Sequence, residues 1–440
     1  MSSTGVRLND MEVPEAAVTA SIPALTYRPR VIDAELGLAL EAAGGVLIEG
    51  ARGSGKTESA RQIAKSEVRL DTDMQARNAG LIAPEVLLEG DNPRLIDEWQ
   101  LVPEIWNQVR RRIDDTGGRA GLFILTGSAE ARDDATRHSG AGRIVRLTMR
   151  PMSLTEMGYS SGAVSLAGLL DGETPHAGDQ GLGIREIAEI IAVGGWPALQ
   201  ARTVDQALTA VRSYLTESAR VDLRRIDGPR HEPQRVAKVL RSLARFTACA
   251  IGNKPIADDA SDPDDPISRQ AVSQYLSALA GIFVLEDLPA WAPTLRATDR
   301  VRKKPKHHFV DPSIAVAALR ADPDRLVREV DTLGLLFESL VVRDLRVYAQ
   351  AMSASVMHFQ EQRIEADAIV ECPDGRWAAF EMKLGLSHVE AGVESLLALR
   401  RRLAGNRQGE PASLNVITGW GYAYQRPDGV NVIPVSALAP

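Results

Sequence analysis

The sequence predicts an α/β protein of several domains, because three segments of different pattern follow one another along its 440 residues. Residues 45–57 form an apolar run that leads through a glycine-rich turn into a helical stretch. Residues 231–312 contain two amphipathic helical patterns, then two short strand-like runs around a basic turn. Residues 364–383 contain two strand-like runs joined by a Pro-Asp-Gly turn. We therefore expect a parallel-sheet domain, a helical and winged-helix module, and a C-terminal α/β domain.

The glycine-rich turn of the first segment has the pattern G-x-x-x-x-G-K-[ST]. The apolar run 46–48 predicts a buried strand before it, and residues 58–64 predict a helix after it. In this context successive backbone N–H groups converge on a phosphate, the lysine neutralises the β- and γ-phosphates, and the threonine hydroxyl binds Mg²⁺. The sequence therefore predicts an ATP site with Mg²⁺. Its expected contacts are Gly50, Arg52, Gly53, Ser54, Gly55, Lys56 and Thr57.

A second short strand, residues 94–98, ends in Asp97 and Glu98. Two carboxylates at this point are typical of a Walker B element, in which Asp97 would hold Mg²⁺ and Glu98 would polarise the attacking water. The pattern alone also fits a polar strand end before a helix. Its position downstream of the glycine-rich turn favours the functional interpretation.

The strongly apolar run 121–128 predicts a strand that ends in hydroxyls. In a parallel sheet this end faces the ligand crevice, so Thr126 or Ser128 would sense the γ-phosphate, or would cap the next helix instead. Arg143 precedes the next predicted strand, 144–147. We take it as the candidate arginine for stabilising transition-state charge, acting in cis or from a neighbouring subunit.

The composition is typical of a globular protein without membrane spans. Hydrophobic residues make up 44% and charged residues 25%, and the net charge is −7. The negative net charge argues against non-specific coating of nucleic acid, although a local basic surface stays open. The first residues lack an apolar signal-peptide core, no run reaches a membrane span, and Cys249 and Cys372 stand far apart. We expect a cytoplasmic protein without a membrane partner.

The central part of the chain predicts mostly helices. Residues 159–181 are rich in Gly, Ser, Asp and Pro and predict a linker, and residues 182–230 predict a helical region. The module 231–312 would place a helix bearing Arg269, Gln270, Ser273 and Gln274 in a DNA major groove. The basic turn would then contact phosphate through Arg302, Lys303, Lys304 and Lys306. The alternative is a winged helix that serves interdomain packing.

The C-terminal part contains a second candidate site. Alternation places Glu381 and Lys383 on one face of a strand, and Asp367 can join them across the hairpin. Asp367 and Glu381 would bind Mg²⁺ or Mn²⁺, Lys383 would orient the attacking water, and Glu338 on helix 333–349 would complete the metal shell. This is the constellation of a PD-(D/E)-x-K nuclease. A surface hairpin with ordinary charges is the alternative.

Several motifs together resemble one widespread prokaryotic family. They are the turn from Gly50 to Thr57, LIDEWQ (95–100), LTGS (125–128), the stretch from Gly142 to Glu156, and Gly194-Gly195-Trp196-Pro197. The family's members are AAA-type P-loop ATPases with a C-terminal restriction-endonuclease-like domain. The polar residues 1–22 predict a flexible N-terminus. The resemblance implies an ATPase domain over 23–158 and a nuclease-like domain over 313–440. It also implies that a neighbouring subunit completes the site in a homo-oligomer.

Two functional hypotheses follow. In the first, a Mg²⁺-dependent ATPase couples its nucleotide cycle to the winged-helix module and to a nuclease-like domain acting on nucleic acid. In the second, an ATP-dependent switch binds DNA or an unknown protein partner and cuts nothing. The intact Asp367, Glu381 and Lys383 favour the first. The low aromatic content and the negative net charge favour the second.

Overall fold

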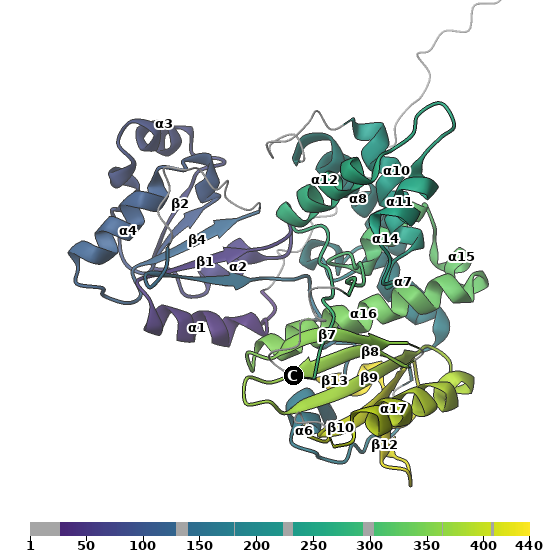
Figure 1. Ribbon diagram of the computed structural model, residues 1–440. Helices are drawn as coiled ribbons and strands as arrows, with labels where there is room; N and C mark the ends of the chain where they lie inside the picture. The colour runs from purple at the N-terminus through teal and green to yellow at the C-terminus, as the bar shows by residue number, and fades with distance from the viewer. Residues whose placement is uncertain are drawn as a thin grey trace, which may run out of the picture.

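The computed structural model describes residues 27–128, 140–179, 181–222, 232–293, 303–362, 364–405 and 409–440. The chain forms three regions (Figure 1): an N-terminal sheet domain in purple and blue, a group of teal helices, and a green and yellow sheet with its own helices. Within these ranges, none of the helices has both the length and the apolar character that a membrane crossing needs.

The N-terminal sheet has five parallel strands in the order β2-β3-β4-β1-β5. They are β1 (Gly45–Glu49), β2 (Ser66–Arg69), β3 (Arg94–Asp97), β4 (Phe123–Gly127) and β5 (Ile144–Thr148). The predicted parallel α/β domain is therefore confirmed. Strand β4 lies between β1 and β3, so the hydroxyls at its end stand between the glycine-rich turn and the Asp97 carboxylate.

Helices cover both faces of this sheet because alternate strand residues point to opposite sides. Val46 and Ile48 belong to the cluster with α1 (Ile32–Ala42) and α2 (Lys56–Arg61). Leu47 belongs to the cluster with α4 (Ile105–Asp115). The latter face also carries α3 (Met74–Ile82), η2 (Pro84–Leu88) and η3 (Trp99–Leu101).

The segment predicted as a linker contains regular structure. After α5 (Leu154–Met157), the chain forms β6 (Val164–Ser165) and α6 (Leu166–Leu170). Strand β6 pairs with β13 (Leu438–Ala439) at the end of the chain, and Ala177 forms a bridge with Ala423. Residues 159–177 are thus joined to the C-terminal region by backbone pairing. Composition could not show this, because the strand partner lies more than half the chain away.

The middle region is helical. Its elements are α7 (Ile184–Val193), η4 (Pro197–Leu199), α8 (Val204–Glu217), the π-turn η5 (Ser218–Asp222), α10 (Pro233–Arg245), α11 (Asn253–Ala260), α12 (Arg269–Gly281), α14 (Pro312–Leu319) and α15 (Pro323–Arg328). Helix α14 packs against α7, α8 and α10, so a boundary at residue 312 divides elements that pack together. The two predicted wing strands appear as the isolated bridges Leu285–Phe309 and Leu288–Lys306.

The C-terminal sheet has six strands in the order β11-β12-β10-β9-β8-β7. The elements are α16 (Val330–Gln350), β7 (Ser355–Glu361), β8 (Ile364–Glu371), β9 (Trp377–Lys383), η6 (Leu386–His388), α17 (Val389–Leu403), β10 (Ser413–Thr418), β11 (Tyr424–Gln425), β12 (Val430–Pro434) and η7 (Val435–Ala437). Strand β9 pairs antiparallel with β8 and parallel with β10. The predicted hairpin is therefore extended into a mixed sheet.

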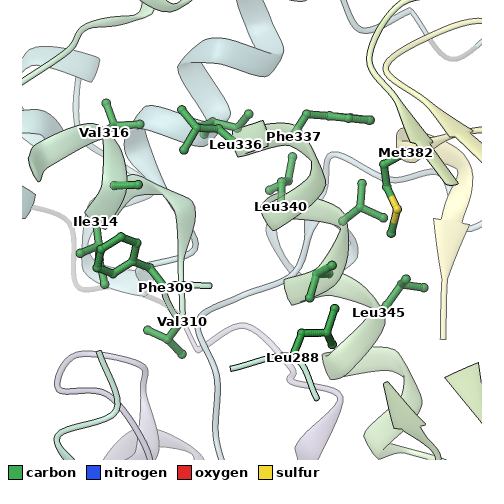
Figure 2. Packing of buried hydrophobic residues seen from close by; sticks show 14 of the residues in the cluster. Leu288, Phe309, Val310, Ile314, Val316, Leu336, Phe337, Leu340, Leu345 and Met382 are labelled. Atoms are coloured by element: carbon green, nitrogen blue, oxygen red, sulfur yellow. The ribbon is translucent and has the colours of Figure 1, made fainter. Parts of the chain in front are cut away.

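Helix α16 joins the middle and C-terminal regions through one core. Figure 2 shows Leu336, Leu340 and Leu345 along this helix, with Ile314 of α14 on one side and Met382 of β9 on the other. All five side chains are buried. A helix that is apolar on opposite faces must be covered on both, so α16 fixes the two regions to each other.

Candidate nucleotide site and carboxylate cluster

The glycine-rich turn requires its glycines for steric reasons. Gly50 has φ of +150°, and a Cβ there would lie 2.2 Å from the Met149 carbonyl oxygen. Gly55 has φ of +107° at the residue before α2. Only glycine adopts such angles at low cost, so the loop wraps closely over the end of β1.

Lys56 is buried inside this loop. Its Nζ donates to the carbonyl oxygens of Gly50 at 2.8 Å and Ala51 at 2.9 Å. Burial lowers the pKa of Lys56 to about 8, an effect that the charges of Glu98 and Asp97 only partly oppose. Two neutral carbonyl groups thus accept hydrogen bonds from the ammonium, and an anion bound in the loop would supply a closer counter-charge.

Two threonine hydroxyls converge on the Asp97 carboxylate. Thr57 Oγ1 donates to Asp97 Oδ1 at 2.8 Å, and Thr126 Oγ1 donates to the same oxygen at 2.5 Å. The three residues come from α2, β3 and β4. The topology thus brings together the Thr57 hydroxyl and the Asp97 carboxylate, the two groups that the sequence assigns to Mg²⁺.

Glu98 lies next to this cluster in a left-handed conformation, with φ of +55°. Its Oε2 accepts hydrogen bonds from Gln100 and, at 3.2 Å, from Ser128 Oγ. Thr126 therefore orients Asp97, and Ser128 orients Glu98. The structure places both hydroxyls at the Walker B carboxylates, and a contact of either with a γ-phosphate stays a prediction.

The residues present fit a bound Mg²⁺–nucleotide. Ser54 Oγ is buried in the loop and has no hydrogen-bond partner in the described part of the chain. Lys56 supplies a buried positive charge in the same loop, and Thr57 with Asp97 supplies oxygen ligands of the kind that Mg²⁺ takes. Arg52 is exposed on the outer side of the same turn.

The structure does not bring Arg143 to this site. Arg143 precedes β5, and the Gly45 N–H donates to its carbonyl at 3.0 Å, whereas the glycine-rich turn follows the opposite end of β1. A strand of five residues separates the two ends by roughly 16 Å. The Arg143 guanidinium instead pairs with Asp114 at 2.7 Å on the surface. The expectation of a cis-acting Arg143 is wrong for this arrangement, and only a role in trans stays open.

Arg30 contacts the glycine-rich turn, although the sequence did not predict it as a site residue. Its guanidinium donates to the carbonyl oxygens of Ser54 and Arg150 at 2.8 Å each, and it pairs with Glu156 at 3.0 Å. Arg30 is buried although it stands before α1 in a polar stretch. Its neighbours in the sequence gave no signal, because all three partners come from distant segments.

The Gly-Gly-Trp-Pro motif also lies against the turn. A Cβ at Gly53 would lie 3.9 Å from the Trp196 ring, and one at Gly55 would lie 3.5 Å from Pro197. Trp196 Nε1 donates to Ser313 Oγ at 2.9 Å. Trp196 is buried, and its contacts join the nucleotide turn to the middle region.

The C-terminal carboxylates converge as the hairpin register predicts. Lys383 Nζ lies 2.6 Å from Glu381 Oε2 and 3.8 Å from Asp367 Oδ2. Asp367 Oδ2 also accepts the Met382 N–H at 2.9 Å. Asp367, Glu381 and Glu338 are all buried, which does not agree with the alternative of a surface hairpin with ordinary charges.

A lysine from the middle region lies inside this cluster. Lys306 Nζ is 2.8 Å from Glu338 Oε1, 3.0 Å from Asp367 Oδ1 and 3.1 Å from Glu365 Oε1. Burial opposes the charge of Lys306, but Asp367 and Glu338 outweigh it and raise its pKa well above the ordinary value. The sequence predicted that Lys306 belongs to a basic turn that contacts DNA phosphate. That assignment is wrong, because the side chain is buried among carboxylates.

A metal ion does not fit this cluster as it stands. No group of three or more His, Cys, Asp or Glu side chains has the geometry of a metal site anywhere in the described ranges. The ammonium of Lys306 takes the space between Glu338 and Asp367. Burial and the Asp367 charge raise the pKa of both Glu338 and Glu381 to about 8, which is the response of carboxyls short of positive charge.

The predicted DNA-reading helix is α12. Ser268 caps it by accepting the Ala271 N–H, and Arg269, Gln270 and Ser273 are exposed, while Gln274 is half-buried. Lys304 is exposed, Lys303 is half-buried over the Phe359 ring, and Arg302 lies outside the described residues. A helix therefore forms at these residues, and its role in reading DNA stays a prediction; Lys303 and Lys306 of the expected basic turn contact the C-terminal region.

Comparison with family models matches the three regions separately. Residues 43–158 match an AAA domain, residues 184–325 a domain of unknown function (DUF8612), and residues 333–438 another (DUF4143). The second match spans both the region predicted to be helical, 182–230, and the region predicted to be a winged-helix module, 231–312. It also extends past the expected boundary at 312, in agreement with the packing of α14.

Two relatives match most of the chain. They are the uncharacterized proteins Rv2008c of Mycobacterium tuberculosis and Mb2031c of Mycobacterium bovis, each 25% identical over 374 residues, which is 84% of this chain and 76% of the relative.

Among solved structures, the Walker-type ATPase PABY2304 of Pyrococcus abyssi is 13% identical, covers 67% of this chain and 99% of its own, and has a TM-score of 0.41. The Thermotoga maritima RuvB structure is 16% identical over 59% of this chain and 89% of its own, with a TM-score of 0.26. Residues 43–158 therefore match an AAA domain, and they contain the five-stranded parallel sheet and a glycine-rich turn of the P-loop pattern.

Proposed function

We propose that this protein binds ATP with Mg²⁺ and hydrolyses it at the end of the N-terminal sheet. The observation that carries the proposal is the convergence of Thr57 and Thr126 on Asp97 beside the buried Lys56. Thr57 and Asp97 would hold the Mg²⁺, which supplies charge neutralisation at the phosphates when bound.

Each remaining side chain has a defined task in this proposal. Lys56 exchanges its two carbonyl partners for phosphate oxygens. Glu98 accepts a hydrogen bond from the attacking water and orients it, and Ser128 keeps the Glu98 carboxylate in place. Thr126 fixes the Asp97 carboxylate toward Thr57.

The test compares three variants with the parent protein. Lys56→Ala should lose ATP binding in a fluorescent-nucleotide titration, because the phosphate cation is gone. Glu98→Gln should bind ATP and fail to release phosphate. Lys65→Ala removes an exposed lysine shortly after α2 and should change neither. Undiminished binding by folded Lys56→Ala protein would refute the proposal.

We further propose that the nucleotide state is transmitted to the other two regions, as in a switch. Arg150, which follows β5, pairs with Glu286 of the middle region at 2.6 Å and donates to Gln350 of α16 at 2.8 Å. Gln350 in turn donates to Glu35 of α1 at 2.7 Å. Gly50 and Ala51 of the turn line a cavity of about 300 Å³ together with Arg150 and Glu286.

Nucleic acid is the partner class that the middle region fits. A groove of about 830 Å³ lies between α8, α10, α11 and α14. Its basic residues are Arg212, Arg220, Lys238, Arg241, Arg245 and Arg320, and its acidic residues are Asp259 and Asp262. Asp259 pairs with Arg245 and Asp262 pairs with Lys238, so the remaining arginines give the groove an excess of positive charge. A phosphodiester backbone complements such a groove.

Fluorescence anisotropy with labelled single-stranded and duplex oligonucleotides tests this part. Arg241→Ala with Arg320→Ala should weaken binding and reduce its salt dependence, by a slope of about one for each phosphate contact removed. Arg111→Ala, an exposed arginine on α4, is the matched control. Loss of binding in Arg269→Ala with an unaffected groove variant would favour the winged-helix surface instead. No binding by the parent protein would reject nucleic acid as the partner.

Of the two hypotheses, a nuclease-coupled ATPase and an ATP-dependent switch that cuts nothing, the C-terminal cluster favours the switch. The PD-(D/E)-x-K hypothesis needs a divalent cation between Asp367 and Glu381, and Lys306 already neutralises Asp367 from the other side. We therefore propose an ATP-driven switch without nuclease activity. Mg²⁺- or Mn²⁺-dependent cleavage of DNA or RNA that disappears in Lys383→Ala would overturn this choice.

A further inference from the structure

The cluster around Lys306 has the geometry of a complete ammonium site. An ammonium has three N–H donors, and Lys306 Nζ has three carboxylate oxygens within 2.8 to 3.1 Å, from Glu338, Asp367 and Glu365. Only 3% of the Lys306 side chain is exposed. These distances are those of charge-assisted hydrogen bonds, and they are longer than the roughly 2.0 to 2.6 Å of Mg²⁺ or Ca²⁺ to oxygen.

The backbone fixes the lysine in this place. The Lys306 N–H donates to the Leu288 carbonyl at 3.0 Å, and the Leu288 N–H donates back at 2.8 Å. The segment before it pairs with the C-terminal sheet through His358, whose Nε2 lies 3.0 Å from the Lys304 carbonyl oxygen. The bridged segments 285–288 and 306–309 of the middle region, here called the wing, fix the backbone of Lys306. Strand β7 of the C-terminal region fixes the segment just before it, so the position of Lys306 in the cluster is set by the backbone.

A second cation occupies the other side of the cluster. Lys383 lies 2.6 Å from Glu381 and 3.8 Å from Asp367. Asp367 thus stands between two ammonium groups, one on each carboxylate oxygen. A divalent ion at Asp367 would meet strong repulsion from both, and it would have to displace Lys306 to reach Glu338.

We infer that Lys306 is the resident cation of this cluster, a lysine supplied by the middle region in the place where a metal-dependent nuclease would hold its ion. The C-terminal domain then takes no divalent metal while the wing is docked. The inference concerns the cluster alone and does not depend on ATP binding or hydrolysis. It also implies that the wing excludes divalent cations from the cluster, so that removal of the lysine should create a carboxylate site for a divalent cation.

The experiment measures Mn²⁺ binding by electron paramagnetic resonance in nucleotide-free protein. The measured quantity is the Mn²⁺ binding that disappears when Asp367→Asn is added to the same protein. The parent protein and Lys304→Met, which removes the exposed neighbouring lysine, should show none of it. Lys306→Met should gain one such site, and its unfolding temperature should fall in metal-free buffer and recover with Mn²⁺. Lys306→Gln provides a second, polar variant of similar length.

The outcomes divide cleanly. Asp367-dependent Mn²⁺ binding by the parent protein overturns the inference, and this measurement requires no Lys306 variant to fold. Folded Lys306→Met or Lys306→Gln protein without the new Mn²⁺ site also overturns it. If both variants fold only when Mn²⁺ is present, the ion has replaced the lysine, which is the expected exchange. If both stay unfolded with Mn²⁺ present, the exchange fails and the inference is rejected.

Discussion

Arg343 and Asp311 form an ion pair of 2.9 Å that is almost completely buried, with 1% and 0% of the two side chains exposed. Asp311 also accepts the Gly195 N–H at 2.9 Å, and Arg343 pairs with Asp344 at 2.7 Å. Asp344 accepts the Leu154 N–H at 3.0 Å. A continuous polar chain therefore joins α16 to the two motifs that flank the nucleotide turn.

Breaking this pair should destabilise the protein strongly. Arg343→Met leaves two buried carboxylates without their cation, and we expect a loss of about 3 to 5 kcal/mol in the free energy of unfolding, measured in urea. Arg325→Met is the control, because its pair with Glu329 is exposed and screened by solvent and should therefore contribute little to stability. Equal effects of the two substitutions would contradict the importance of the buried chain.

Thr126→Val should impair ATP hydrolysis while leaving the fold intact. The substitution keeps the side-chain volume and removes the hydrogen bond that orients Asp97. Loss of a group that orients a metal ligand typically costs about 10- to 100-fold in activity or metal affinity. Phosphate release as a function of Mg²⁺ concentration measures it. Thr148→Val at the end of β5 is the control and should behave like the parent protein.

Arg143→Ala should affect hydrolysis only between subunits, because Arg143 lies at the other end of the sheet from Lys56. Arginines supplied by a neighbour increase rates by about 10³-fold or more. Mixing Arg143→Ala with Lys56→Ala protein should restore activity that neither has alone. Full activity of Arg143→Ala at dilutions where light scattering shows monomers would remove this arginine from catalysis.

The contact between Arg150 and Glu286 should make stability depend on pH. Burial raises the pKa of Glu286, but the charges of Arg150 and Arg346 more than offset this and lower it to about 2. A carboxyl with a lowered pKa in the folded state stabilises the protein above its unfolded pKa, near 4.5, and loses that contribution as the pH falls toward 2. The difference in unfolding free energy between the parent and Glu286→Gln should therefore shrink between pH 5 and pH 3. A difference that stays constant over this range would show that the pair carries no net charge interaction.

The sequence by itself determined the elements whose signals are local. The glycine-rich turn and the apolar strands 46–48 and 121–128 depend on neighbouring residues, so periodicity and turn chemistry revealed them. The sides of the hairpin bearing Asp367, Glu381 and Lys383 followed from strand alternation alone. These predictions succeed because the backbone geometry of one element fixes which of its side chains share a face.

Only the tertiary structure decided what those residues meet. Arg30 looks like an ordinary polar residue, yet it supports the turn through three partners from distant segments. Lys306 belongs to a basic run whose composition predicts an exposed position. In the structure its ammonium lies between Glu338 and Asp367, which are 32 and 61 positions further along the chain. Burial of a charge depends on which opposite charges the fold brings within hydrogen-bond distance, and that information is spread over the whole chain rather than contained in any one stretch.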